Sequence, residues 1–346
     1  MKHQATVIAL SSLMVTSALL STGGNTFAAT QHTSRIDATF KVGLVADTGG
    51  INDHGFNQLA YDGVIEAHKK FGIEYTVAQT HQSSEYVSKL TKFARLSYNL
   101  VIAVGYPMES AVRHVSKNYP GIKFLIIDDA IANRKNVMSA LFNSQQSGFL
   151  VGVLAGLMNQ QKHILQINGK NVIGIIGGQD IPPVESYITG IEAGVKKVDP
   201  KATILKSFAK SFSSPKTGRK LALSQISKGA DIVFQAAGGT GLGVIEAAKQ
   251  KGVFAIGVDA NQNYLAPNTV MTSALKEIDV AVLTAVSDTL HNRFKSGVVN
   301  FDLADKGVGY VKPIKVVPVS AVKKVNSFIP LLNSGKIKLP TLLPKH

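Results

Sequence analysis

The sequence predicts an α/β protein of two lobes, each built on a parallel β-sheet that is covered by helices on both faces. The first observation is that short apolar runs alternate with stretches of helical periodicity from Phe40 onward. The second is that this alternation stops at an apolar helix and then starts again. The third is that 346 residues, 45% hydrophobic and 17% charged, suffice for about two domains and exclude a mainly disordered chain.

The first lobe is predicted over residues 40–143. Its strands are apolar on both faces, as the runs KVGLVA and LVIAV show, which is typical of strands buried between two helical layers. The expected strands are residues 41–46, 74–78, 100–104 and 123–127, and the expected helices are residues 56–71, 85–96 and 109–117.

The second lobe is predicted over residues 144–275 and repeats the strand–helix order, although no repeat of individual residues is evident. The expected strands are residues 172–176, 203–207, 231–235, 253–258 and 270–274, and the expected helices are residues 147–159, 184–198, 217–227 and 242–251. A helix at 276–294 follows. Segments from about 276 to 333 are expected to complete the first lobe, and residues 334–346 are expected to form a basic tail.

Residues 1–29 have the pattern of an export signal. A polar start with Lys2 precedes the uncharged apolar run 5–20, and small and turn-forming residues complete the segment. The run is short for a membrane-spanning helix, which needs about 20 apolar residues. An uncleaved anchor is the alternative. The mature chain is therefore predicted to be exported, with cleavage near Ala28 or Ala29.

The chain is strongly basic, with a net charge of +15. Seven lysines and no acidic residue lie between Lys312 and His346. This stretch lacks arginine and, apart from Phe328, aromatic residues, so it does not have the composition of a nucleic-acid-binding segment. Contact with an anionic cell surface and a merely solvated face are the two interpretations, and the solvated face is the simpler one.

Several kinds of chemistry are excluded or unsupported. The chain has no cysteine, which removes disulfides, thiolate metal sites and iron–sulfur clusters. Its nine histidines are scattered, and the motifs of serine hydrolases, P-loop proteins and zinc proteases are absent. The sequence therefore predicts a binding protein rather than an enzyme, with no metal and no cofactor.

The candidate binding residues follow the predicted strands, because ligands of open α/β sheets bind beyond the carboxyl ends of the strands. Two lobes that face each other bring those ends to one cleft. Asp47 ends the first strand and opens a glycine-rich loop that contains Asp53 and leads to Phe56 and Asn57. This loop offers two carboxylates, an amide and a ring to a ligand. Capping of the following helix is the alternative role of Asp53.

Asp128 ends the strand KFLII and is followed by Asp129. A metal site at this pair is a weak interpretation, because no third ligand lies at a suitable spacing, so we expect Asp128 to accept hydrogen bonds from a ligand. In the second lobe, Gly238 and Gly239 begin a glycine-rich turn before a helix, where backbone N–H groups can reach a ligand. The G-x-G-x-G spacing of this turn differs from a dinucleotide fingerprint.

Three further residues complete the candidate set. Asp259 ends a strand, and a carboxylate there suits the vicinal hydroxyls of a ribose. Lys276 stands near a helix start, where the helix dipole disfavours a cation, so a ligand role competes with that of a solvated lysine. Phe212 lies in a polar loop before a helix, where it either plugs the core or stacks on a base.

Eight strings of the sequence occur in the order known from one protein family, from about Lys41 to Val282. They are GLVADTGGINDHGFNQLAYDG, KFLIIDD, SGFLVGVLAGLM, VIGIIGGQDIPPVESYITGIEAGV, SFSSPKTGRKLAL, ADIVFQAAGGTGLGVIEAAK, AIGVDANQN and VMTSALKEIDVAV. In them the chain resembles the basic membrane protein family of substrate-binding proteins, which includes the purine nucleoside receptor lipoproteins of nucleoside ABC transporters. The resemblance implies the type I periplasmic-binding protein fold, with two Rossmann-like lobes joined by a hinge.

The resemblance also implies a function and a division of the site. A nucleoside, with purine nucleosides favoured, would be delivered to the permease of an ABC importer by closure of the cleft, and the protein would be a monomer. In the implied site Phe56 and Phe212 sandwich the base, Asp47, Asp53, Asn57 and Asp128 lie around it, and Gly238, Asp259 and Lys276 hold the ribose.

The chain departs from the family pattern in ways that bear on ligand and location. It has no lipobox cysteine, so lipid anchoring is not expected. Gln146, Ser214 and Ala260 stand where family members often carry acids. Two other functions stay open. One is a sensor or regulatory protein of the same fold without a transporter, and the other is a nucleoside-processing enzyme, for which the sequence offers no nucleophile or base pair.

Overall fold

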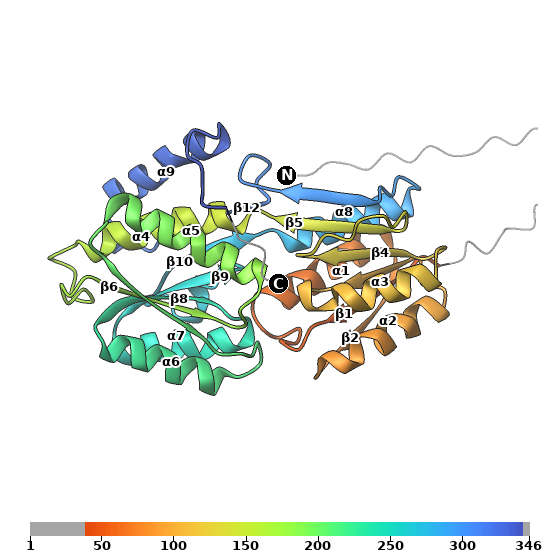
Figure 1. Cartoon of the computed structure of the whole chain (residues 1–346), viewed down its shortest axis with the longest axis horizontal. Helices are drawn as coiled ribbons and strands as arrows, with labels where there is room; N and C mark the ends of the chain where they lie inside the picture. The colour runs from red at the N-terminus through yellow and green to blue at the C-terminus, as the bar shows by residue number, and fades with distance from the viewer. Residues whose placement is uncertain (1–38, 342–346) are drawn as a thin grey trace, which may run out of the picture. The chain divides into compact units, whose positions relative to one another are not determined.

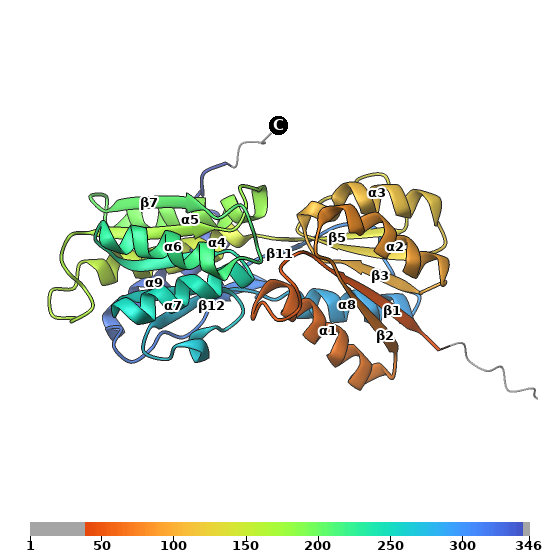
Figure 2. The same cartoon turned by 90° about the horizontal axis from the view of Figure 1, so that it is seen from below.

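The computed structural model describes residues 39–341, so the predicted export signal at residues 1–29 lies outside the described residues. The described chain contains two six-stranded sheets, each in its own lobe (Figures 1 and 2). We define the first lobe as residues 39–143 with 278–301, and the second lobe as residues 144–277 with 302–341. Among the described helices, none has both the length and the hydropathy that crossing a membrane requires.

The first sheet is parallel throughout, in the order β11-β5-β4-β3-β1-β2. Its strands are β1 (Lys41–Ala46), β2 (Glu74–Gln79), β3 (Leu100–Ala103), β4 (Lys123–Ile127), β5 (Val137–Phe142) and β11 (Gly297–Phe301). The sequence analysis does not predict β5 or β11. The edge strand β11 alternates between half-buried and exposed residues, and Ser139 interrupts the apolar run of β5, so neither strand carries the continuous apolar signal of the central strands.

Four helices cover the first sheet. They are α1 (Phe56–Phe71) and α8 (Ile278–Leu290) on one face, and α2 (Tyr86–Arg95) and α3 (Glu109–Asn118) on the other. Successive residues of a strand point to opposite faces, so Leu44 packs with α1 and α8 while Val45 packs with α2 and α3. The sheet is therefore buried on both faces, as its apolar strands predict.

The second sheet repeats this topology in the order β12-β10-β9-β8-β6-β7. Its strands are β6 (Val172–Gly177), β7 (Thr203–Phe208), β8 (Ala230–Ala236), β9 (Phe254–Asp259), β10 (Val270–Lys276) and β12 (Val308–Tyr310). Strand β12 is antiparallel to β10, and the other described pairs of this sheet are parallel. Position by position, β4 of the first sheet corresponds to β9 of the second, and β5 corresponds to β10.

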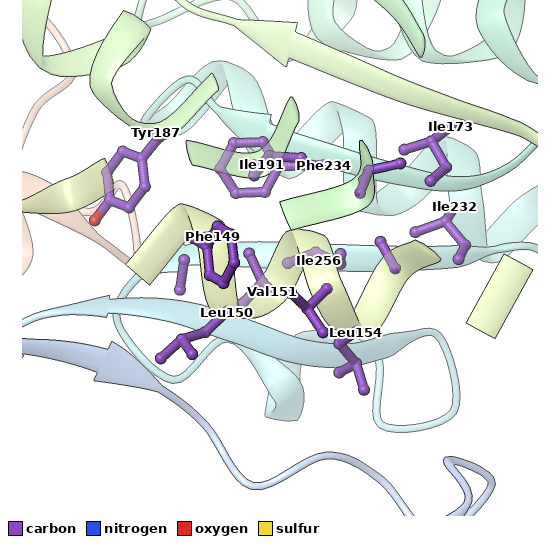
Figure 3. Close-up of a cluster of buried hydrophobic side chains, with 14 of the residues drawn as sticks. Phe149, Leu150, Val151, Leu154, Ile173, Tyr187, Ile191, Ile232, Phe234 and Ile256 are labelled. Carbon is purple, nitrogen blue, oxygen red and sulfur yellow. The ribbon is translucent and has the colours of Figure 1, made fainter. Parts of the chain in front are cut away.

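Five helices cover the second sheet (Figure 1). They are α4 (Ser144–Asn159), α5 (Pro182–Val198) and α9 (Val319–Asn333) on one face, and α6 (Pro215–Ser227) and α7 (Gly239–Lys251) on the other. Figure 3 shows part of the core between α4, α5 and the sheet, to which α4 contributes Phe149 and Leu154 and the strands contribute residues such as Ile256. Short 3₁₀ helices lie at η1 (Ser83–Glu85), η2 (Tyr106–Met108) and η3 (Asn263–Leu265).

The C-terminal segment differs from the predicted division of the chain. The sequence analysis assigns residues 276–333 to the first lobe, and α8 and β11 do join the first sheet. However, β12 pairs with β10, and α9 packs on α4, where the rings of Phe328 and Phe149 meet edge to face at 5.5 Å. The physical reason is that α9 has an apolar stripe that needs burial, and the second lobe covers it.

The predicted basic tail is also packed on the second lobe as far as the structure describes it. Ile337 and Leu339 are partly buried against the core of that lobe. The side-chain amide of Gln145 donates a hydrogen bond to the carbonyl oxygen of Pro340 at 2.6 Å. The last described residues therefore extend the second lobe rather than leaving it.

Candidate functional site

A pocket with a cavity volume of about 50 Å³ lies where the carboxyl ends of strands from both sheets meet. This volume is below the range of small-molecule sites, about 300–1,000 Å³, so a ligand of that size requires the pocket to widen. The lining residues are Asp47, Asp53, Phe56, Asn57, Gly105, Tyr106, Pro107, Asp128, Ile181, Pro183, Val184, Tyr187, Phe212, Ala236, Ala237, Gly238, Val258, Asp259 and Lys276. The structure thus brings together every residue of the predicted set except Gly239, which begins α7 beside the pocket.

The loop between β1 and α1 is organised around Asn57. The side-chain nitrogen of Asn57 donates to Asp47 Oδ1 at 2.7 Å and to Asp53 Oδ2 at 3.0 Å. The side-chain oxygen of Asn57 accepts a hydrogen bond from the backbone N–H of Asp47. Both oxygens of Asp53 also accept backbone N–H groups, from Gly55, Asn57 and Gln58 at the start of α1. Asp53 therefore caps the helix, which was its alternative role, while it also lines the pocket.

Asp47 keeps one carboxylate oxygen available. Its Oδ1 accepts bonds from Asn57 and from the backbone N–H of Gly49, whereas Oδ2 has no hydrogen-bond partner among the described residues. Burial raises the pKa of Asp47 to about 6, against the lowering effect of these two bonds, and the charge of Asp53 raises it further. A ligand that donates a hydrogen bond to Oδ2 would compensate for the lost hydration of this carboxylate.

Asp128 and Lys276 form an ion pair between the two lobes. The ammonium group of Lys276, at the end of β10, lies 2.6 Å from Asp128 Oδ2, which follows β4. Both side chains are buried, with 2% and 5% of their surface exposed. The same ammonium lies over the rings of Phe56 and Tyr187, each 5.2 Å from its centroid. Lys276 is therefore a buried residue of the pocket lining, and the alternative of a solvated lysine is excluded.

Asp259 is held by a tyrosine that the sequence analysis does not single out. The hydroxyl of Tyr187 donates to Asp259 Oδ1 at 3.1 Å, and Figure 3 shows this hydroxyl turned away from the apolar cluster around it. Burial raises the pKa of Asp259 to about 6, the positive charge of Lys276 opposes the increase, and the negative charge of Asp128 adds to it. The second oxygen of Asp259 has no partner among the described residues.

Four aromatic side chains line the pocket, and they include two half-buried phenylalanines, one from each lobe. Phe56 begins α1, and Phe212 lies in the loop between β7 and α6. The ring of Phe212 rests on Gly178, where any side chain would collide with it. Gly238, with φ +53°, has a backbone conformation that favours glycine. At Gly239 a side chain would press on the carbonyl oxygen of Phe212, so this glycine supports the loop without lining the pocket.

Some lining residues carry no polar signal in the sequence. Tyr106 follows β3, and Ile181 and Val184 follow β6, so all three lie after strand ends. Their residue types, however, are as common in a core as in a binding site, so the sequence does not single them out. Tyr187 lies inside α5, where an aromatic residue is more often part of the core. Only its hydrogen bond to Asp259 distinguishes it, and that contact depends on the tertiary structure.

The pocket is suited to a ligand with N–H and O–H donors and an aromatic part. Its charged groups are carboxylates and one ammonium that is already paired with Asp128. Among the described residues, no three side chains of histidine, aspartate or glutamate gather in a way that could hold a metal ion. The chemistry of the lining is therefore that of hydrogen-bond acceptance and stacking.

The chain is similar in sequence to known proteins. The sequence matches the family described as "Bmp: ABC transporter substrate-binding protein PnrA-like" over residues 40–342. It is 30% identical to the CD4+ T-cell-stimulating antigen of Listeria innocua, covering 98% of this chain and 99% of the relative. It is also 30% identical to the ABC transporter nucleoside-binding protein BmpA of Lactococcus lactis, covering 87% of this chain and 90% of that protein.

A solved structure supports the same assignment. A solute-binding protein of an ABC transporter from Aeropyrum pernix superposes with a TM-score of 0.82 and is 26% identical, covering 88% of this chain and 94% of that chain. The type I periplasmic-binding fold and the substrate-binding role that the resemblance implies are thereby confirmed. The chain belongs to the family of PnrA-like ABC transporter substrate-binding proteins.

Proposed function

We propose that the chain binds a nucleoside, with purine nucleosides favoured, between its two lobes and delivers it to an ABC importer. The observation that carries this proposal is the pairing of Phe56 from the first lobe with Phe212 from the second at one pocket lined by carboxylates. Two rings suit the two faces of a flat base, and carboxylates suit its N–H groups. The relative from Lactococcus lactis is named a nucleoside-binding protein.

The base and the ribose are assigned to different parts of the pocket. Asp47 Oδ2 is the acceptor for a donor on the base, since its other oxygen is committed to Asn57 and Gly49. Asp259, with one oxygen held by Tyr187, accepts the ribose hydroxyls. We group Asp128 with Lys276 in the site rather than with Asp47, because the carboxylate of Asp128 and the ammonium group of Lys276 form an ion pair. Its place in the proposed site therefore moves from the base toward the ribose.

Cleft closure is the proposed mechanism of capture. Each lobe supplies at least one ring and at least one acceptor, so a ligand contacts its full set of partners only when the lobes are together. A ligand that binds the closed form better than the open form shifts the population toward it. No reaction is part of this proposal, so prolonged incubation of the protein with a nucleoside should yield no product.

The location follows from the family, because solute-binding proteins of ABC importers are exported. We propose that the protein carries no acyl anchor, since the sequence contains no cysteine to which a lipid would be attached. We also propose that it acts as a monomer, because both halves of the pocket come from one chain. The mass of the exported protein and light scattering in solution test these two points.

The test is calorimetric titration of protein that was unfolded, stripped of ligand and refolded. The panel contains adenosine, guanosine, inosine, cytidine, uridine, the free bases, ribose and the 5′-monophosphates. We expect one-to-one binding of nucleosides and much weaker binding of bases and ribose. The monophosphates should bind weakly too, because the one ammonium of the described lining is already paired. Absence of binding by every nucleoside would contradict the proposal.

A matched pair of variants locates the ligand. Asp259→Asn removes a charged acceptor from the pocket and should weaken nucleoside binding by roughly tenfold or more, as expected for a hydrogen bond to a charged group. Asp288→Asn changes an aspartate of α8 that does not line the pocket and should leave affinity unchanged. Equal affinities of the two variants would refute the assignment of Asp259.

A further inference from the structure

The positive charge of the protein is divided unequally between the lobes. The first lobe has 13 lysine and arginine residues against 11 aspartate and glutamate residues, a net charge of +2. The second lobe has 21 against 10, a net charge of +11. The excess positive charge is therefore concentrated on the second lobe, and an anionic partner would be attracted mainly to that lobe.

Part of this excess lies on one segment of the second lobe. Six exposed lysines, which we call the C-terminal basic face, lie along α9 and the residues on either side of it: Lys312, Lys315, Lys323, Lys324, Lys336 and Lys338. Residues 311–341 contain no acidic residue, and none of the six lysines forms an ion pair with a described residue. Their charges are therefore not neutralised within the described structure.

Apolar side chains stand among these lysines. Val316 is 40% exposed and Val319 is 70% exposed, and both lie between Lys315 and Lys323 in the chain. They contrast with the buried stripe of α9, in which Phe328 contacts α4 and holds the helix in place. Only Lys323, Lys324 and Val319 of this set lie in α9 itself. A basic surface with exposed apolar residues has the composition of segments that lie at the interface of anionic membranes.

The C-terminal basic face is separate from the pocket. None of residues 311–341 lines the pocket, and α9 lies on the outer side of α4 (Figure 1). A partner that contacts the C-terminal basic face therefore binds residues that are not part of the pocket lining.

We propose that the C-terminal basic face docks the protein on membranes that contain anionic phospholipids. The lysines attract the head groups, and the two valines favour a bilayer interface over a fully hydrated polyanion. Docking through the second lobe would concentrate the protein at the membrane without using residues that line the pocket.

The test compares two variants of equal net charge. In the first, Lys312, Lys315, Lys323 and Lys324 are replaced by glutamine. In the control, four exposed lysines of α6 and α7, on the opposite face of the second sheet, are replaced: Lys216, Lys220, Lys249 and Lys251. Co-sedimentation with vesicles of phosphatidylcholine, with and without one quarter phosphatidylglycerol, is measured at low and high salt for chains with the same N-terminal segment.

We expect the parent and the control variant to bind the anionic vesicles within about twofold of each other, and the first variant to bind about tenfold less. Binding of the parent should fall at high salt. An equal loss in both variants, or no binding by the parent, would overturn the proposal, since the first result would assign the effect to net charge alone. Thermal unfolding and nucleoside titration of each variant show that the fold and the pocket are intact.

A second pair of measurements separates a membrane from a soluble polyanion. Replacing Val316 and Val319 by serine should weaken vesicle binding but leave the retention of the protein on polyglutamate unchanged. If vesicle binding and retention on polyglutamate fall equally, or if neither of them changes, the valines have no specific role at a bilayer and the membrane assignment is wrong.

Discussion

At the residue scale, the two aspartates at equivalent strand ends share an uncommon backbone conformation. Asp128 follows β4 with φ +65°, and Asp259 ends β9 with φ +60°. For residues other than glycine this left-handed region is costly, although aspartate tolerates it better than most. Such strain persists mainly where the surrounding structure imposes it, and functional sites are common among these places. Both aspartates line the pocket, so the repeated topology places the same strained turn in each half of the site.

Tyr187 is predicted to position Asp259 for the ribose. In Tyr187→Phe the carboxylate loses its donor at Oδ1, so it is free to rotate and its charge is less compensated. We expect nucleoside affinity to fall about tenfold, in line with a hydrogen bond to a charged group, while affinity for the free base stays unchanged. Calorimetric titration of the parent and the variant with a nucleoside and with its free base measures the ratio of the two affinities.

The control for this change is Tyr310→Phe. Tyr310 donates to Asn326 at the surface of the same lobe, away from the pocket, so its loss should not affect either affinity. A parallel fall in base and nucleoside affinity in Tyr187→Phe would mean that the ring, rather than the hydroxyl bond, supports the site.

The buried carboxylate of Asp47 makes stability depend on pH. Because burial raises its pKa from 3.8 to about 6, the charged form is disfavoured in the folded protein above pH 6 and the penalty disappears below about pH 4. Asp47→Asn should therefore raise the free energy of unfolding of the ligand-free protein at pH 8, by at most about 3 kcal/mol. The gain should shrink as the pH falls from 6 to 4. Urea unfolding across this range measures it.

Glu66→Gln is the matched control, because Glu66 is exposed on α1 and loses the same charge. It should change stability little at any pH. If Asp47→Asn is no more stable than the parent at pH 8, Asp47 does not carry the inferred penalty.

At the scale of elements, the close contact of α4 and α5 sets the position of Tyr187. A side chain at Gly190 or Gly194 of α5 would meet the backbone carbonyl of Gln145 or Phe149 on α4, and Gly148 and Gly152 of α4 are equally close to α5. The two helices therefore pack backbone to backbone. Because α5 carries Tyr187, their spacing is transmitted to the pocket.

Gly190→Ala should consequently affect both stability and binding. The added methyl group forces the helices apart, which costs about 1–3 kcal/mol or more for overpacking, and moves Tyr187 away from Asp259. The control Gly121→Ala adds a methyl group where no heavy atom lies within 4 Å, so little change is expected. Thermal unfolding and nucleoside titration measure the two effects. If Gly190→Ala is destabilised but binds nucleosides as tightly as the parent, the spacing of α4 and α5 does not affect the pocket.

At the scale of the whole described chain, contacts between the lobes accompany the pocket. Besides the pair of Asp128 and Lys276, the side-chain amide of Gln262 donates to the carbonyl oxygen of His54, and a ring nitrogen of His54 lies 2.8 Å from the hydroxyl of Tyr264. His54 belongs to the loop that begins at Asp47, whereas the other two residues follow β9. The loop between β1 and α1 therefore has hydrogen-bond partners in the opposite lobe.

The buried ion pair is predicted to show strong coupling. Asp128→Asn leaves the ammonium of Lys276 without its partner, and Lys276→Met leaves the carboxylate of Asp128 alone, so each single variant should be destabilised by several kcal/mol. The double variant should lose less than the sum of the two. A double-mutant cycle by urea unfolding gives the coupling.

The exposed pair of Lys206 and Glu192 is the control, and its coupling should be at most about 1 kcal/mol. Strictly additive effects at Asp128 and Lys276 would show that the two charges act independently.

Much of the fold could be predicted because the central strands are buried on both faces. Such strands need continuous apolar runs, as in β1, β3, β4 and β8, and their observed bounds lie within one or two residues of the predicted ones. Strands β5, β11 and β12 and helix α9 are absent from the prediction. Strands β11 and β12 are at sheet edges, so their sequences need not be apolar throughout.

Strand direction and a local run of apolar residues suffice to place Asp47, Asp128 and Asp259 at the carboxyl ends of parallel strands, so the amino-acid sequence is enough to identify them. The contacts of such residues, in contrast, become known from the folded structure. Asp53 caps a helix, Asp128 pairs with a lysine 148 residues away, and Tyr187 reaches Asp259 from another element. Pairings of this kind depend on how distant segments pack, and packing depends on the whole chain rather than on any local pattern.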